Sequence, residues 1–407
     1  MASDIFLLNI SGQDKPGLTS SLTAVLAAYD AKVLDIGQAN IHDTLSLGIL
    51  FQIKSGKKSA AVLKDLLFKS YELGIKAKFK PITLEDYEKW VSLQGKDRYI
   101  VTLLGEKLTA EQISEVTKVI SEKNLNIDAI KRLTGRASLV NEDDYPRASI
   151  QLSIRGIIED KSEFTEKFMQ ISRDLDVDIA FQEDNIYRRN RRLVCFDMDS
   201  TLIQTEVIDE LAEFAGVGEQ VRAITELAMQ GEIDFNESFK QRMLLLKGLK
   251  EDVLEKVAIN LPITKGARRL IDTLKTYGFK TAILSGGFTY FGHYLQKELG
   301  IDYVFANQLE IKDGVLTGGY IGEIVDGNKK AAYLKELAHK EGLHISQTIA
   351  IGDGANDLPM LNLAGLGIAF HAKPKVKDNA QSAISSIGLD GVLYLLGYHD
   401  RHIDLLP

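Results

Sequence analysis

The sequence predicts an α/β protein whose main domain is a doubly wound parallel sheet with an inserted helical cap, preceded by two smaller α+β domains of ferredoxin-like type. From residue 192 onward, short and nearly all-apolar strands alternate with helices, as in parallel sheets that are buried on both faces. Helical segments too numerous for one crossover interrupt them at about residues 206–262. Before residue 185, the order strand-helix-strand-strand-helix-strand occurs twice.

Length and composition narrow the class of protein. A chain of 407 residues has room for several domains, and its composition, 45% hydrophobic and 26% charged, is that of an ordinary globular protein. The formal net charge of −8 disfavours nucleic acid as a partner, because affinity there depends on lysine and arginine. We expect no signal peptide, no membrane span and no membrane partner. The single cysteine, Cys195, excludes an internal disulfide and favours a cytoplasmic location.

Three domains are expected, at residues 1–85, 96–184 and 192–407. The first two share an element order but little identity, so a duplication is suggested rather than shown. The polar stretch LEDYEKWVSLQGKDR is expected to separate them. The basic stretch IYRRNRR after the second is expected to be a solvated linker rather than a nucleic-acid patch, because the chain as a whole is acidic.

Carboxylates gather at the ends of two apolar strands of the third domain. LVCFDMDST places Asp197 and Asp199 two residues apart, so that in a strand both side chains point to one face and repel unless a cation lies between them. GDGANDLPML places Asp353 and Asp357 at the same sheet edge. With Asp197 and a carbonyl from residue 199, Asp353 offers the oxygen ligands that Mg²⁺ prefers. Taken alone, DMDST is also explained by a structural pair or a helix cap.

Two further segments offer contacts for a phosphate group. LSGGF ends a strand beside a helix start, where Ser285 offers a hydroxyl and Gly286 and Gly287 offer unshielded amides. Lys330, in GNKKAAYL, opens a helix and can place its charge on a phosphoryl oxygen. Alone, the first is equally well a simple turn and the second a solvated lysine. Together with the acids they indicate phosphoryl transfer to a carboxylate nucleophile.

The order DMDST, LSGG, NKK and GDGAND resembles the haloacid dehalogenase superfamily of phosphatases. TEVIDELA and FNESFKQRMLLLKG resemble, more closely, its phosphoserine phosphatase family. The resemblance implies a Rossmann-like sheet and Mg²⁺-dependent hydrolysis of O-phospho-L-serine, the last step of serine biosynthesis. It implies that Asp197 is the nucleophile, that Asp199 is the general acid and base, and that Lys330 stabilises charge. It also implies that Asp197, Asp199 and Asp353 hold the metal.

The same resemblance assigns the residues around the nucleophile. Asp357 is expected to support the metal ligands from behind. Glu206 is expected to bind the ammonium of the substrate and Arg242 its carboxylate. Further substrate contacts are expected from Ser285, Gly286 and Asn356. Taken alone, Glu206 and Arg242 are the kind of helix charge that is usually solvated.

The stretch SGQDKPGLTSSL resembles the ACT domains, which are amino-acid-sensing modules of metabolic enzymes. The resemblance implies that Asp14 and Gly17 help to bind an effector, L-serine or another amino acid, at a helix N-terminus. The alternative is that Asp14 merely caps the helix and Pro16 starts it. The second unit has LLGEKLTAEQ at this place and lacks the element. We expect it to pair with another ACT unit, and the protein to be a homodimer.

Two other functions stay open from the sequence. The phosphoryl group could pass to another alcohol such as homoserine, because acceptor choice depends on the shape of the cap. The chain could instead be a non-catalytic amino-acid sensor with a vestigial α/β domain. Intact acids in both aspartate motifs disfavour this second alternative.

Overall fold

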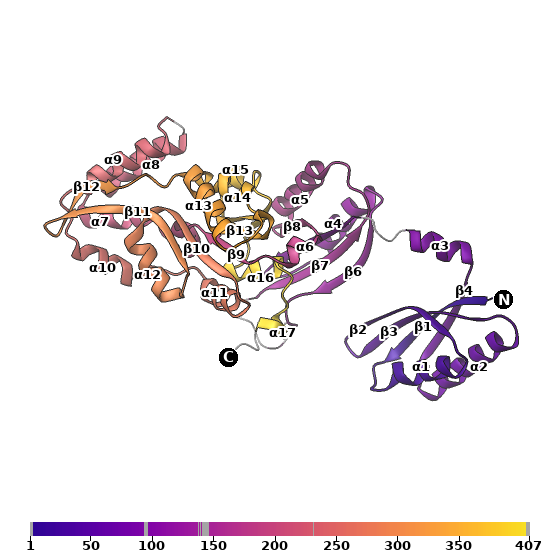
Figure 1. Ribbon diagram of the computed structural model, residues 1–407. Helices are drawn as coiled ribbons and strands as arrows, with labels where there is room; N and C mark the ends of the chain where they lie inside the picture. The colour runs from indigo at the N-terminus through magenta and orange to yellow at the C-terminus, as the bar shows by residue number, and fades with distance from the viewer. Residues whose placement is uncertain are drawn as a thin grey trace. The chain divides into compact units, whose positions relative to one another are not determined.

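The computed structural model describes residues 3–92, 97–136, 138, 140, 146–230 and 232–403. The chain divides into two compact units, Met1–Lys96 and Asp97–Pro407, and each is described by itself. Figure 1 shows the course of the chain. The expected domain ends at residues 1, 96 and 407 lie outside the described residues.

The first unit is a four-stranded antiparallel sheet with two helices. Its strands lie in the order β2-β3-β1-β4. Alternate residues of the central strand β3 are buried, which is the period expected when one face of a sheet packs against helices. These elements confirm the predicted ferredoxin-like order. Their bounds are β1 (Ser3–Gln13), α1 (Leu18–Ala28), β2 (Lys32–Ile41), β3 (Thr44–Lys54), α2 (Lys57–Glu72) and β4 (Lys76–Ile82).

The polar stretch after this sheet separates the two units, as predicted, but its described part is not a plain loop. It forms a helix, α3 (Leu84–Ser92). The hydroxyl of Thr83 accepts a hydrogen bond from the backbone N–H of Asp86 at 3.0 Å, which caps the helix start.

The second unit begins with another four-stranded sheet, in the order β6-β7-β5-β8. It repeats the ferredoxin-like pattern, as predicted. The bounds are β5 (Arg98–Gly105), α4 (Ala110–Glu122), β6 (Asn126–Arg132), β7 (Ala148–Arg155), α5 (Lys161–Leu175) and β8 (Asp178–Glu183).

A seven-stranded sheet forms the rest of the second unit, in the order β12-β11-β10-β9-β13-β14-β15. All neighbouring strands are parallel except β11 and β12, which form an antiparallel hairpin that the sequence reasoning missed. The hairpin turns at Asp313 and Gly314, both with positive φ. Strand bounds are β9 (Leu193–Phe196), β10 (Lys280–Phe288), β11 (Tyr303–Lys312), β12 (Val315–Ile321), β13 (Thr348–Gly352), β14 (Leu366–Phe370) and β15 (Ser382–Ile384).

Helices and buried apolar clusters lie on both faces of this sheet, as expected for a doubly wound domain. Its helices are α11 (Ala267–Thr276), α12 (Thr289–Leu299), α13 (Gly327–Lys340), α14 (Leu358–Leu363), α15 (Pro374–Lys377), α16 (Val392–Leu395) and α17 (Asp400–Ile403). Among the described residues, we find no helix with the length and apolar character needed to cross a membrane.

The predicted helical cap lies between β9 and α11. It consists of α7 (Val207–Ala215), α8 (Gly218–Gln230), α9 (Phe235–Leu245) and α10 (Asp252–Ile259). Helix α9 contacts β12 and α10 contacts α12. Figure 1 shows the cap helices near the end of the sheet where β11 and β12 lie. The two chain segments that enter and leave the cap pair with each other through Ile203 and Ile263.

The basic stretch IYRRNRR is not a solvated linker, and that prediction was wrong. Part of it forms α6 (Ile186–Arg189), and Arg188 and Arg191 are only 8% and 5% exposed. The reason is that the second ferredoxin-like sheet packs against the large domain. The carboxylate of Asp178 in β8 accepts hydrogen bonds from the backbone N–H groups of Ser385 and Ser386, each at 2.9 Å. Arg188 and Arg191 of the IYRRNRR segment are buried where this sheet meets the large domain.

Candidate active site

Three carboxylates meet at the carboxyl ends of two adjacent strands. Asp197 follows β9, and Asp353 and Asp357 follow β13, which pairs in parallel with β9. Each carboxylate offers an oxygen that lies within 4.8 Å of the others. The sequence therefore placed these acids at the correct edge, and Asp357, expected behind the metal ligands, lies within the cluster itself.

A buried lysine joins two of these acids. Lys330 of α13 is 0% exposed, and its Nζ lies 2.8 Å from Asp197 Oδ1 and 2.6 Å from Asp357 Oδ1. Burial by itself lowers the pKa of Lys330, but the attraction of Asp197 and Asp357 outweighs it and raises the pKa above the ordinary value. Lys330 is thus charged, and Asp197 Oδ1 also accepts the N–H of Met198 at 2.8 Å.

The acids outnumber this single ammonium. Burial, followed by repulsion from Asp197, raises the pKa of Asp353 to about 8 and that of Asp357 to about 7. A divalent cation among the carboxylates would lower both values. Closely spaced carboxylate oxygens are the donor set that Mg²⁺ takes in proteins, so the residues fit such an ion. Thr201 orients one of them, since its hydroxyl lies 3.3 Å from Asp353 Oδ1.

The side chain of Asp199 has different partners. Its Oδ1 accepts the N–H of Val207, the first residue of the cap helix α7, at 2.9 Å, and its Oδ2 lies 3.5 Å from the hydroxyl of Ser285. Burial, followed by repulsion from Glu206 and then Asp197, raises its pKa well above the ordinary value. Asp199 is thus suited to carry a proton. A metal contact through residue 199 stays a prediction.

The LSGG segment lies directly against Asp199. The N–H of Gly287 donates to the hydroxyl of Ser285 at 2.8 Å. A Cβ at position 287 would lie 2.7 Å from Met198 Cε and closer still to Asp199 Oδ2, so only glycine fits without displacement. At Gly286, a Cβ would lie 2.8 Å from the ring of Phe235, which begins the cap helix α9.

The two predicted cap residues lie near the acids. Glu206 precedes α7, and its Oε1 accepts a hydrogen bond from the hydroxyl of Ser200 at 2.8 Å. Burial raises the pKa of Glu206. Burial lowers the pKa of Arg242 on α9, while the nearby charges of Glu206 and Asp209 oppose that shift. Glu206 and Arg242 are therefore close enough to shift each other's pKa, and the pKa of each is also shifted by an acid of the DMDST segment.

Asn356 lies in the loop that carries the acids, next to Asp357, and its side chain lies across Gly354. Sequence reasoning missed the orienting role of Ser200, although the residue stands within DMDST. It also missed Asn307 of β11, which contacts the LSGG segment and carries no recognisable motif.

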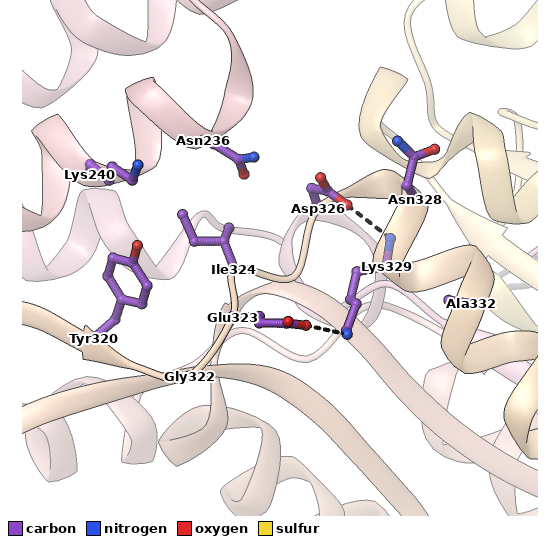
Figure 2. Close-up of a pocket in the computed structure, with 10 residues that line it drawn as sticks. All are labelled: Asn236, Lys240, Tyr320, Gly322, Glu323, Ile324, Asp326, Asn328, Lys329 and Ala332. Atoms are coloured by element: carbon purple, nitrogen blue, oxygen red, sulfur yellow. Dashed lines mark hydrogen bonds and ion pairs between the residues drawn. The ribbon is translucent and has the colours of Figure 1, made fainter.

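A groove of about 500 Å³ lies where the cap meets the core, and Figure 2 shows it between α9 and the segment joining β12 to α13. It contains none of the acids described above. It adjoins them through sequence neighbours, since Asn236 follows Phe235 and Lys329 precedes Lys330. The lining residues are Asn236, Lys240, Tyr320, Gly322, Glu323, Ile324, Asp326, Asn328, Lys329 and Ala332.

Comparison with protein families matches three ranges of the chain. Residues 4–80 and 98–182 each match an ACT domain, and residues 194–362 match the haloacid dehalogenase-like hydrolases. Fold and site thus define a hydrolase domain of that superfamily preceded by two ACT domains. The phosphoserine phosphatase of Streptomyces coelicolor is 41% identical over 98% of this chain and 93% of its own length. The chain therefore belongs to the phosphoserine phosphatase family.

Other relatives agree. Phosphoserine phosphatase SerB2 of Mycobacterium tuberculosis is 37% identical over 96% of this chain and 92% of its own. The crystal structure of a probable phosphoserine phosphatase from Vibrio cholerae, 36% identical, covers 77% of this chain and 90% of its own with a TM-score of 0.58. A HAD-family hydrolase from Salmonella enterica serovar Typhi, 32% identical, covers 73% and 98% with a TM-score of 0.61.

Proposed function

We propose that this protein hydrolyses O-phospho-L-serine to L-serine and phosphate in a Mg²⁺-dependent reaction. The observation that carries the proposal is Asp197, held by the buried ammonium of Lys330, with a protonatable carboxyl two residues further on. A carboxylate oriented by a cation beside an acid is what a two-step phosphoryl transfer needs.

In the first step, an oxygen of Asp197 attacks phosphorus in line, and the bond from phosphorus to the seryl oxygen breaks. Asp199 donates its proton to that oxygen, so serine leaves as a neutral alcohol. In the second step, water attacks the phosphorus of the aspartyl phosphate, and Asp199 takes a proton from it. The phosphate leaves, and Asp197 returns as a carboxylate.

Lys330 neutralises charge on the phosphoryl oxygens throughout, and the hydroxyl of Ser285 with the amide of Gly286 binds them. Mg²⁺, held by Asp197, Asp353 and either residue 199 or Asp357, would supply further charge neutralisation.

The cap is proposed to select the substrate. Glu206 is held by Ser200 at the start of α7 and would receive the ammonium, while Arg242 would receive the carboxylate and Asn356 would contact the phosphate side. If Arg242 supplies uniform binding, Arg242→Ala raises KM alone; if it positions the transition state, kcat falls as well. Phosphoethanolamine, which lacks the carboxylate, should lose little with this variant.

The decisive experiment compares phosphoserine hydrolysis by the wild type, Asp197→Asn and Asp378→Asn, with and without Mg²⁺. Asp378 is an exposed acid of the same domain, paired with Arg173. We expect Asp197→Asn to abolish turnover and Asp378→Asn to leave it unchanged. Substantial hydrolysis by Asp197→Asn would exclude this nucleophile.

Added homoserine tests the first alternative, since a phosphorylated acceptor among the products would indicate transfer to another alcohol. Absence of turnover together with heat of binding on serine titration would favour the non-catalytic sensor.

Regulation through the first ACT domain is part of the proposal. A pocket of about 420 Å³ lies at the turn between β1 and α1 and is lined by Asp14 and Gly17 among others. Gly17 has a φ of 90° and precedes α1, so amides of a helix N-terminus face a carboxylate there. The side chain of Asn40 donates to the Asp14 carboxylate, which would receive the ammonium. Serine should alter the activity of the wild type and not that of Asp14→Ala.

We also propose a homodimer and a cytoplasmic location. Strand β2 forms one edge of the first sheet and is exposed along nearly its whole length, which suits pairing with a second chain. The buried thiol of Cys195, the only cysteine, suits a reducing compartment. Sedimentation equilibrium would test the dimer, and a monomer at all concentrations would exclude it.

A further inference from the structure

Asn307 is a buried asparagine that makes three hydrogen bonds to the backbone of two active-site segments. It lies on β11 and is 2% exposed. Its Nδ2 donates to the carbonyl of Gly286 at 2.7 Å and to that of Gly287 at 3.3 Å. Its Oδ1 accepts the N–H of Val325 at 2.8 Å. All three of these partners are backbone groups of the segments on either side of Asn307.

The bonds to the glycines fix the orientation of the phosphate-binding loop. Glycine backbone rotates more freely than that of any other residue, so a loop of two glycines needs external support. When Asn307 holds the carbonyl of Gly286, the planar peptide turns the N–H of Gly287 the opposite way. That N–H donates to the hydroxyl of Ser285 at 2.8 Å, and the hydroxyl faces Asp199.

The third bond reaches the segment that carries the lysine. Val325 immediately precedes Asp326, which caps α13 by accepting the N–H of Lys329 at 2.8 Å (Figure 2). Lys330 follows in the first turn of that helix. One amide therefore sets the distance between the loop that binds the phosphoryl group and the ammonium that neutralises it.

We propose that Asn307 is a positioning residue for phosphoryl transfer, which rests on the function proposed above. It touches no reacting atom. It acts by holding Ser285 and the two glycines at a fixed place relative to Lys330.

The test is Asn307→Ala beside Thr281→Val. Thr281 is buried near the start of β10, and its hydroxyl donates to the carboxylate of Asp302, the residue before β11, at 3.1 Å. Both variants lose buried side-chain hydrogen bonds, but only Asn307 contacts the Gly286–Gly287 loop. Because a misplacement of about 1 Å can cost about a hundredfold, we expect kcat/KM for phosphoserine to fall by about that factor in Asn307→Ala. The kcat/KM of Thr281→Val should stay within about threefold of the wild-type value, which is far smaller than the loss expected for Asn307→Ala.

A readout of phosphate binding separates positioning from lost stability. Inorganic phosphate should inhibit Asn307→Ala more weakly than the wild type, with a raised KM for phosphoserine. Loss of folded protein would lower kcat per total chain and leave both KM and phosphate inhibition unchanged. Should Asn307→Ala fail to fold, Asn307→Asp keeps the shape and the acceptor for Val325 but loses both donors, and it should show the same changes.

A double-mutant cycle with Ser285→Ala completes the test. If Asn307 acts through the loop, the double variant loses little more than Ser285→Ala alone. Fully multiplicative losses, or an Asn307 variant that matches Thr281→Val in KM and phosphate inhibition, would overturn the proposal. If instead the wild type does not hydrolyse phosphoserine, that result refutes the proposed function. It is distinct from the results above, which refute the positioning role of Asn307.

Discussion

A single methyl group at Gly287 should remove most of the activity without unfolding the protein. The φ of Gly287 is not positive, so alanine is allowed there, and the effect is steric. The new Cβ would lie 2.7 Å from Met198 Cε, about 0.8 Å inside an ordinary contact of about 3.5 Å, and it would be closer still to Asp199 Oδ2. The carboxyl of Asp199, the proposed proton carrier, must therefore move away by about 1 Å.

Such a displacement is expected to cost about a hundredfold in kcat, or about 2.7 kcal/mol of barrier. Steady-state hydrolysis of phosphoserine measures it. The matched control is Gly319→Ala. Gly319 also donates its N–H to a hydroxyl two residues earlier, Thr317 at 3.0 Å, and its Cβ would lie 2.9 Å from a carboxylate oxygen of Glu310, but none of the atoms that it would meet belongs to the acids of the site.

Gly319→Ala should retain wild-type kcat, because the partly exposed side chain of Glu310 can move aside. If Gly287→Ala kept kcat within threefold of the wild type, the close packing of Asp199 against the loop would not be needed for catalysis, and the reasoning from this contact would fail.

Three further outcomes are expected. Lys330→Met should abolish turnover and lower the thermal midpoint, because removing one partner of a buried ion pair costs about 3–5 kcal/mol; unchanged stability by calorimetry would contradict the pairing. Arg147→Ala should lower the denaturant midpoint more than Arg173→Ala, because Arg147 bonds the fully buried Asp390, whereas the partner of Arg173 is exposed. Equal shifts of the midpoint would contradict this difference between buried and exposed ion pairs. The pKa of Asp400 is lowered in the folded state: burial raises it, but hydrogen bonds from Tyr394 and Gly135 prevail, so its stabilisation is present at neutral pH and lost as pH falls. Asp400→Asn should therefore lower the thermal midpoint at pH 7 and approach the wild type in acid, and a constant difference across pH would refute this.

Local patterns were sufficient to predict most elements. The two ferredoxin-like orders, the cap at 206–262 and the apolar strands all follow from hydrophobic period and turn residues, which are properties of neighbouring positions. The predictions that failed depend on partners distant in the chain. IYRRNRR was expected to be solvated because its charge was visible, whereas its burial follows from Asp178 binding residues more than two hundred positions away.

By itself, the sequence predicted which residues come together at the site. Motif order placed Asp197, Asp353 and Asp357 at one sheet edge, since parallel strands end together, and placed Lys330 at a helix start. Only the tertiary structure decided which partners each of these side chains contacts. It turns Asp199 towards the cap helix rather than the acid cluster, brings Asp357 into that cluster, and gives Asn307 its three bonds. Hydrogen bonds and electrostatic shifts depend on distances of a few ångströms between strands and helices, and those distances are set by packing that no single stretch of sequence encodes.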